Sequence, residues 1–377
     1  MSKIRVAHLF TDVPNGGASG ADYDNGIWEH VLGVERVPLE KGLTDGQIGK
    51  WCEVNNIDVL IATMWGTFVG GYGKPQRGML TIREECPDLK IIGLVDEPLM
   101  VDWAHRYGGT VDTVKQAQGY LDGLGDFDHI MTISRHEDKF YSHKGVPATF
   151  VGLPFPDKTY PSLVRSNPRP EKGNQIWVGL GVGGTAHTRW ERNYGVSLAA
   201  FEAAVELVRA EDPDTADRMR GIMLSWSDKS NQELMLHIKD RYPNVMIQQR
   251  QDMQTFLHFL QSCDACISTI LRDTPGRLVG ECAFFGVPLY GSDVPDIQTE
   301  LWGKEMSFTP WDVMGYAHTV ADQILCGHTK DEQCATARQK LIELYGMDRS
   351  KERFKAILRS MDLNDEWVTQ EDQAVLV

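Results

Sequence analysis

The feature that most constrains the fold is a repeated alternation of short β-rich runs with longer helical patterns. Such alternation predicts parallel strands joined by helices, because a parallel pair needs a long crossover connection. In the first half of the chain, strands are expected at 4–10, 34–37, 59–63, 90–95, 129–133 and 148–151. This series predicts a doubly wound parallel sheet.

A proline-rich segment separates this series from a second one. Residues 154–170 hold five of the 17 prolines, a density that predicts an interdomain linker without regular structure. Strands are then expected at 175–180, 221–225, 245–249, 265–269 and 288–290, and two amphipathic helices follow at 335–345 and 348–361. The length of 377 residues also suits two domains.

These boundaries predict an α/β fold with two Rossmann-like, doubly wound domains that face each other across a cleft. The expected parts are an N-terminal domain over 1–153, a linker over 154–174, a second domain over 175–345, and a C-terminal helix and tail over 346–377. In sheets of this kind ligands bind at the carboxyl ends of the strands. The chemically informative residues should therefore lie on the loops that follow strands.

The segment 272–293 carries the most specific of these signals. Asp273 precedes an expected helix that starts around Gly276, and Glu281 follows eight residues after Asp273. A helix start offers unpaired N–H groups and partial positive charge, which suit a phosphate. Eight helical residues rise ~12 Å. One carboxylate can therefore precede a diphosphate while the other reaches ribose hydroxyls, an arrangement that suits a nucleotide-sugar.

This segment resembles the acidic-x7-acidic donor motif of the GT-B glycosyltransferases, and most closely that of the retaining family 4 enzymes. The Glu-Ala-x-x-x-Gly-x-Pro run of that superfamily corresponds to residues 281–288. The first acid of the motif is usually Glu and is Asp273 here. The resemblance implies that Glu281 binds the ribose, that Asp273 lies beside the transferred sugar, and that Thr274, Pro275, Gly276 and Arg277 contact the donor. A helix capped by Asp273 or Thr274 is the alternative. The resemblance also implies that the C-terminal helix over 346–377 crosses back to the N-terminal domain, whereas the residues alone support only two helices packed on the second domain.

Two further loops of the second domain carry cations at strand ends. Arg189 and Arg192 lie in the loop after the first strand, where GT-B enzymes hold the donor diphosphate with basic residues. Guanidinium groups suit a leaving diphosphate, whose developing charge must be neutralised. Arg250 follows the third strand of this domain, a position that lies beside the nucleobase in the superfamily.

The first domain offers two more candidate segments. Gly16 and Gly17 follow the first strand, where GT-B enzymes often place a Gly-Gly pair near the diphosphate, although a plain glycine-rich turn also fits. The loop lacks the Gly-x-Gly-x-x-Gly and P-loop patterns, which disfavours NAD and ATPase functions. Asp96 and Glu97 follow the fourth strand, where many retaining members place a His. Either acid could act as a general base in an inverting reaction. Pro98 makes a structural turn equally compatible.

Neither a metal nor a bound cofactor is expected. The seven cysteines are scattered, and the Cys263-x-x-Cys266 pair lacks a second Cys or His pair. Asp212-Pro213-Asp214 imitates a metal motif but follows a long helix, so it predicts a turn.

The sequence thus predicts a cytoplasmic, metal-independent hexosyltransferase that uses a nucleotide-diphosphate sugar, a UDP-sugar, with retention. The acceptor could be a sugar, a glycoconjugate or a hydroxymethylated DNA base. A net charge of −15 disfavours DNA. No apolar run is long enough to span a membrane, and the oligomeric state stays open. The alternatives are a nucleotide-sugar epimerase of the same fold and a catalytically silent nucleotide-sugar-binding protein.

Overall fold

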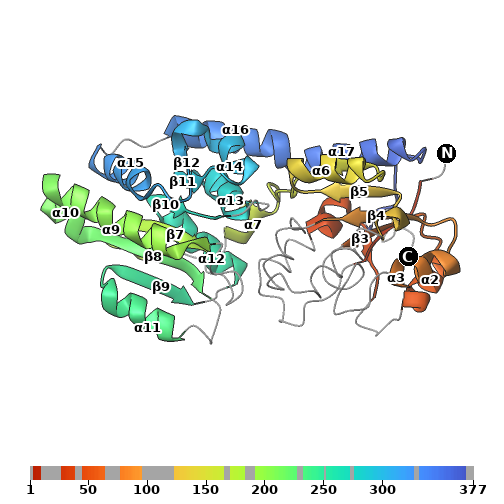
Figure 1. Cartoon of the computed structure of the whole chain (residues 1–377), viewed down its shortest axis with the longest axis horizontal. Helices are drawn as coiled ribbons and strands as arrows, with labels where there is room; N and C mark the ends of the chain where they lie inside the picture. The colour runs from red at the N-terminus through yellow and green to blue at the C-terminus, as the bar shows by residue number, and fades with distance from the viewer. Residues whose placement is uncertain are drawn as a thin grey trace. The chain divides into compact units, whose positions relative to one another are not determined.

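The computed structural model describes residues 3–9, 27–38, 45–63, 77–95, 123–164, 170–182, 192–226, 232–249, 252–271, 276–326 and 331–370. The chain divides into two units (Figure 1). The first joins Met1–Pro156 to Tyr345–Val377, and the second spans Asp157–Leu344. Each unit is built on a parallel sheet of six described strands, which confirms the predicted α/β, doubly wound class.

In the first unit the strand order is β2-β1-β3-β4-β5-β6. The strands are β1 (Val6–Leu9), β2 (Glu35–Arg36), β3 (Val59–Thr63), β4 (Lys90–Leu94), β5 (His129–Thr132) and β6 (Ala148–Phe150). Successive side chains of a strand point to opposite faces. In β3, Leu60 accordingly enters one buried cluster and Ile61 the other, and Ile91 and Ile92 of β4 divide in the same way. The sheet is therefore buried on both faces, as the crossover helices of a parallel sheet require.

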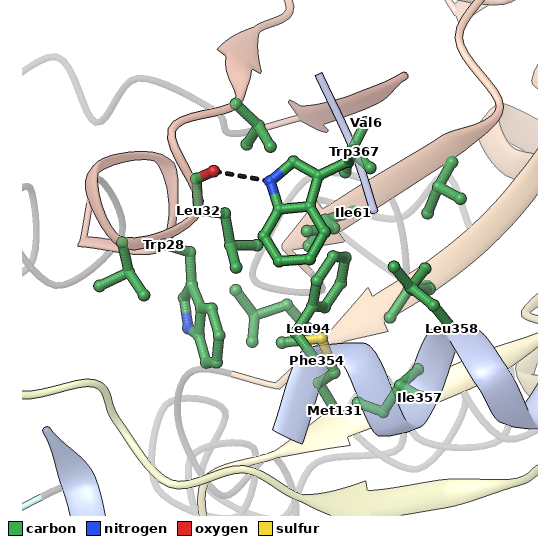
Figure 2. Close-up of a cluster of buried hydrophobic side chains, with 14 of the residues drawn as sticks. Val6, Trp28, Leu32, Ile61, Leu94, Met131, Phe354, Ile357, Leu358 and Trp367 are labelled. Carbon is green, nitrogen blue, oxygen red and sulfur yellow. Dashed lines mark hydrogen bonds between the residues drawn. The ribbon is translucent and has the colours of Figure 1, made fainter. Parts of the chain in front are cut away.

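Helices from both ends of the chain cover this sheet. One face packs against α2 (Asp45–Val54), α3 (Arg77–Glu85) and α6 (Arg135–His143). The other packs against helical residues 27–32 and against α17 (Met347–Ser360). Figure 2 shows Phe354, Ile357 and Leu358 of α17 among the side chains of this second cluster.

The segment after α17 is hydrogen-bonded to the first unit beside Ile4. The Ile4 amide donates to the Glu366 carbonyl at 3.0 Å, and the Val368 amide donates to the Ile4 carbonyl at 2.9 Å. Between these two bonds, the Trp367 indole Nε1 donates to the Leu32 carbonyl at 2.7 Å (Figure 2). The end of the chain thus packs beside its beginning.

In the second unit the strand order is β12-β11-β10-β7-β8-β9. The strands are β7 (Ile176–Val182), β8 (Met219–Trp226), β9 (Val245–Gln249), β10 (Ala265–Ser268), β11 (Leu289–Ser292) and β12 (Ser307–Phe308). The helices are α7 (Tyr160–Val164), α9 (Tyr194–Glu211), α10 (Pro213–Arg218), α11 (Gln232–Arg241), α12 (Met253–Ser262), α13 (Arg277–Phe285), α14 (Asp296–Trp302), α15 (Val313–Cys326) and α16 (Asp331–Tyr345). The chain runs outward through β7, β8 and β9, and then returns to β10 on the other side of β7.

Two local predictions are wrong. The proline-rich segment does contain regular structure, because Pro161 lies in the first turn of α7, where its missing N–H costs nothing. Asp212 does not lead into a simple turn: it caps α10, and its Oδ1 accepts the Thr215 amide at 3.1 Å. Among the helices that the structure describes, none combines the length and apolar character needed to cross a bilayer.

Candidate functional site

The second sheet has a topological switch point between β7 and β10. These strands are parallel neighbours, with Val178 opposite Ala265 and Gly179 opposite Cys266. The connections that leave their carboxyl ends lead to opposite sides of the sheet, toward β8 and toward β11. Sheets with this strand order bind ligands in the crevice that such diverging connections leave. We call residues 192–197 and 276–281, which follow β7 and β10, the switch-point site.

The β7 side of this site is fixed to the end of β10. Thr269, directly after β10, donates its hydroxyl to the Asn193 carbonyl at 3.0 Å, and its oxygen lies 2.7 Å from Ser197 Oγ in the first turn of α9. Asn193 itself has a φ of 49° in the left-handed region and donates through Nδ2 to the Pro310 carbonyl at 2.9 Å. These bonds hold the start of α9 in one position.

Arg192 carries an unmatched donor at this position. Its Nε is buried, and no hydrogen-bond acceptor among the described residues reaches it. A buried donor without a partner is costly, and the cost is greater for a charged group. An anion is the natural partner for a guanidinium in this state, because charge-assisted hydrogen bonds are the strong ones.

The β10 side of the site begins with Gly276 and α13. Gly276 has a φ of 61°, which other residues adopt only with strain. A Cβ at this position would also clash with Cγ2 of Ile297 in α14. The glycine therefore permits both the turn into α13 and the close packing of α14 against it. The first turn of α13 presents the N–H groups and partial positive charge of a helix start.

Glu281 lies one turn further along α13 and is almost completely buried, with 1% of its surface exposed. Its Oε1 accepts the Tyr160 hydroxyl of α7 at 3.0 Å. The same oxygen lies 3.3 Å from Nε of Arg277, four residues earlier on the same helix. Arg277, predicted to contact the donor, is thus paired with the predicted ribose-binding carboxylate.

The structure places four of the predicted site residues, Arg192, Gly276, Arg277 and Glu281, on the loops and helix starts at one edge of one sheet. Nine others lie outside the described residues: Gly16, Gly17, Asp96, Glu97, Arg189, Arg250, Asp273, Thr274 and Pro275. The roles assigned to all of these residues remain predictions.

Sequence reasoning missed Tyr160, Thr269 and Ser197. Tyr160 belongs to the segment predicted to be a linker, and its contact with Glu281 joins positions 121 residues apart. The sequence predicts Thr269 only as the last residue of the strand at 265–269. No local pattern indicates such contacts, since they depend on which elements the fold brings together.

Three cysteines in and beside β10 are structural. Cys263, Cys266 and Cys282 are buried. The hydrogen bond with Cys266, together with burial, holds the pKa of the Cys263 thiol well above its usual range. Burial, reinforced by the neighbouring Glu281, raises the pKa of Cys282. Neutral buried thiols are poor nucleophiles and poor metal ligands. In the described part of the chain, no three His, Cys, Asp or Glu side chains gather into a group that could hold a metal ion.

Comparison with known proteins identifies the fold. No protein-family model matches the sequence, and no curated protein gives a significant sequence match. Solved structures do match. The trehalose-6-phosphate synthase OtsA superposes with a TM-score of 0.68 at 10% identity, over 94% of this chain and 99% of that one.

Two further structures match over nearly their whole length. Sucrose-phosphate synthase from Thermosynechococcus elongatus gives a TM-score of 0.64 at 10% identity, over 96% of this chain and 99% of its own. A trehalose-6-phosphate structure from E. coli, bound with UDP-2-fluoro glucose, gives 0.65 at 9% identity, over 94% and 99%. With its two parallel six-stranded sheets and this likeness across nearly the whole chain, the protein has the GT-B fold of the glycosyltransferases.

Proposed function

We propose that the protein is a glycosyltransferase that moves a sugar from a nucleotide-diphosphate donor, a UDP-sugar, to an acceptor hydroxyl. The observation that carries the proposal is the buried, unmatched Nε of Arg192 at the switch point of the second sheet, on the same edge as the start of α13. The likeness to a structure bound with UDP-2-fluoro glucose supports a uridine donor.

In this proposal Arg192, with Arg189, binds the donor diphosphate. The start of α13 at Gly276 receives the β-phosphate or the sugar, together with Thr274 and Pro275. The two arginines stabilise the negative charge that develops on the diphosphate as the glycosidic bond breaks. Such stabilisation raises turnover more than it raises ground-state affinity.

Two carboxylates and a third cation complete the assignment. Glu281 accepts the ribose hydroxyls, Arg250 lies beside the nucleobase, and Asp273 lies beside the transferred sugar, where it favours an oxocarbenium-like transition state. The resemblance of the acidic-x7-acidic layout to that of retaining enzymes favours front-face attack with retention, in which a phosphate oxygen of the leaving diphosphate takes the proton of the acceptor hydroxyl. Asp96 or Glu97 acting as general base would instead give inversion. The anomeric configuration of the product, read by NMR, separates these two courses.

The acceptor is a sugar, a glycoconjugate or a hydroxymethylated DNA base. Phosphorylated sugars belong in the acceptor screen because two structural neighbours are named as synthases of sugar phosphates. The net charge of −15 makes DNA the least favoured of these acceptors, because it repels a polyanion. Metal independence and a cytoplasmic location are parts of the proposal. Activity that survives EDTA supports the former, and fractionation of the native cells tests the latter.

The test is a thermal-shift panel of UDP, GDP, ADP and their common sugar conjugates, with and without magnesium. A ligand that binds only the native state raises the melting temperature by mass action. We expect stabilisation by a UDP-sugar without magnesium, and release of UDP once the correct acceptor is added. Conversion of the donor to its epimer without acceptor would indicate an epimerase, and binding without turnover a silent binding protein. No shift with any nucleotide contradicts the proposal.

A further inference from the structure

Tyr160 is a buried aromatic residue at the start of α7, and it packs against α13. Its ring stacks on Phe285, with centroids 6.1 Å apart and 6° between the planes. Phe284 approaches the same ring edge-on at 6.0 Å. Aromatic packing on two sides therefore fixes the position of the ring independently of its hydroxyl group.

The hydroxyl group of Tyr160 makes a polar contact inside this apolar setting. It donates to Oε1 of Glu281 at 3.0 Å, and Arg277 Nε lies 3.3 Å from the same oxygen. A glutamate has three side-chain torsions and, when buried, needs donors that offset its lost hydration. Two donors from different elements, meeting at one oxygen, restrict the last torsion and fix the plane of the carboxylate.

We propose that Tyr160 is a positioning residue for the donor: its hydroxyl group orients Glu281 so that this carboxylate accepts the ribose hydroxyls. This inference rests on the proposed function. It means that Tyr160 of α7 helps the site to prefer nucleotides with ribose hydroxyls over nucleotides that lack them. Tyr160 acts through Glu281 and does not touch the nucleotide. The contribution is specific to ribose, since phosphate and base are bound by other groups.

The variant Tyr160→Phe removes the hydroxyl group and keeps the stacked ring. The probes are the nucleoside diphosphate with the largest effect in the thermal-shift panel, expected to be UDP, and its 2′,3′-dideoxy analogue. Calorimetric titration of wild type should show tighter binding of the ribonucleotide. In Tyr160→Phe we expect affinity for the ribonucleotide to fall about ten-fold, since hydrogen bonds to charged acceptors are the stronger class. Affinity for the dideoxy analogue should stay unchanged.

Tyr290→Phe is the matched control. Tyr290 in β11 is also fully buried, and its hydroxyl group lies 3.3 Å from Oε1 of Gln323 in α15. Loss of this hydroxyl should leave the preference for the ribonucleotide as in wild type. In a Glu281→Gln background, Tyr160→Phe should cause no further loss of ribonucleotide affinity, because the two residues act through one contact.

The outcomes separate the possible failures. Equal weakening of both ligands in Tyr160→Phe would show a purely structural role and overturn the inference. An unchanged preference for the ribonucleotide would do the same. A wild-type protein that binds both ligands equally would refute the ribose role of Glu281 and the inference with it. A wild-type protein that binds no nucleoside diphosphate would overturn the proposed function itself.

Discussion

Asn193, Gly276 and Glu281 of the switch-point site are each contacted by a residue from another element. Thr269, after β10, fixes the backbone next to Arg192; Tyr160 of α7 contacts Glu281; and Ile297 of α14 packs against Gly276. Groups that bind a charged ligand are most effective when such contacts hold them in place before the ligand arrives. The geometry of the site therefore depends on contacts between residues that are far apart in the sequence.

Gly276→Ala should strongly destabilise the second unit. A Cβ at φ 61° costs about 1–2 kcal/mol. The clash with Ile297 adds overpacking, for a total of about 3 kcal/mol. Equilibrium urea unfolding measures the loss.

Gly286→Ala is the control for this prediction. Gly286 closes α13 with a φ of 71°, and nothing lies within 4 Å of an added Cβ. Its replacement should therefore cost only the backbone strain of about 1–2 kcal/mol. Equal losses in the two variants would show that the contact with Ile297 does not constrain the start of α13.

At the scale of elements, the C-terminal segment is part of the first unit's core. Phe354 and Leu358 of α17 are fully buried against the first sheet, and the Trp367 ring meets Phe354 edge-on with centroids 5.3 Å apart. The chain end therefore contributes buried apolar area to a sheet formed by its first half. Its removal should expose that face of the sheet.

Trp367→Ala should lower the free energy of unfolding of the first unit by about 3–5 kcal/mol, because it empties a large buried site and removes the bond to Leu32. Urea unfolding followed by circular dichroism checks this value. Val54 of α2, which lies in the same unit and is 77% exposed, provides the control. Its replacement by Ala should change stability by less than about 0.5 kcal/mol. A loss of similar size in both variants would contradict the role of the C-terminal segment.

At the scale of the whole molecule, the two parallel sheets could be predicted because most of their strands are short apolar runs between helical patterns. The predicted strand bounds 59–63 and 245–249 match β3 and β9. The elements without a prediction are short: α7, α10, α14 and β12 have too few residues to show a period. Pro161 also hid α7 from prediction, because a proline is taken as a helix breaker in sequence although the first turn of a helix tolerates it.

Some features of the site could likewise be predicted from the sequence, and others could not. The spacing of Gly276 and Glu281 is a local property of one helix, so the sequence could predict that they share α13. The anchoring of Asn193 by Thr269, and of Glu281 by Tyr160, depends on strand order and helix packing. No local pattern encodes these contacts. The sequence can therefore predict which candidate site residues share an element, but not which residues from other elements hold them.

The most direct test of the account is amide hydrogen exchange of the wild-type protein with and without the nucleotide-sugar that raises its melting temperature most. If the donor binds at the switch point between β7 and β10, slower exchange should appear at residues 192–197 and 276–281, where the diphosphate and ribose meet the starts of α9 and α13. Bound nucleotide-sugar with unchanged exchange at both segments would contradict it.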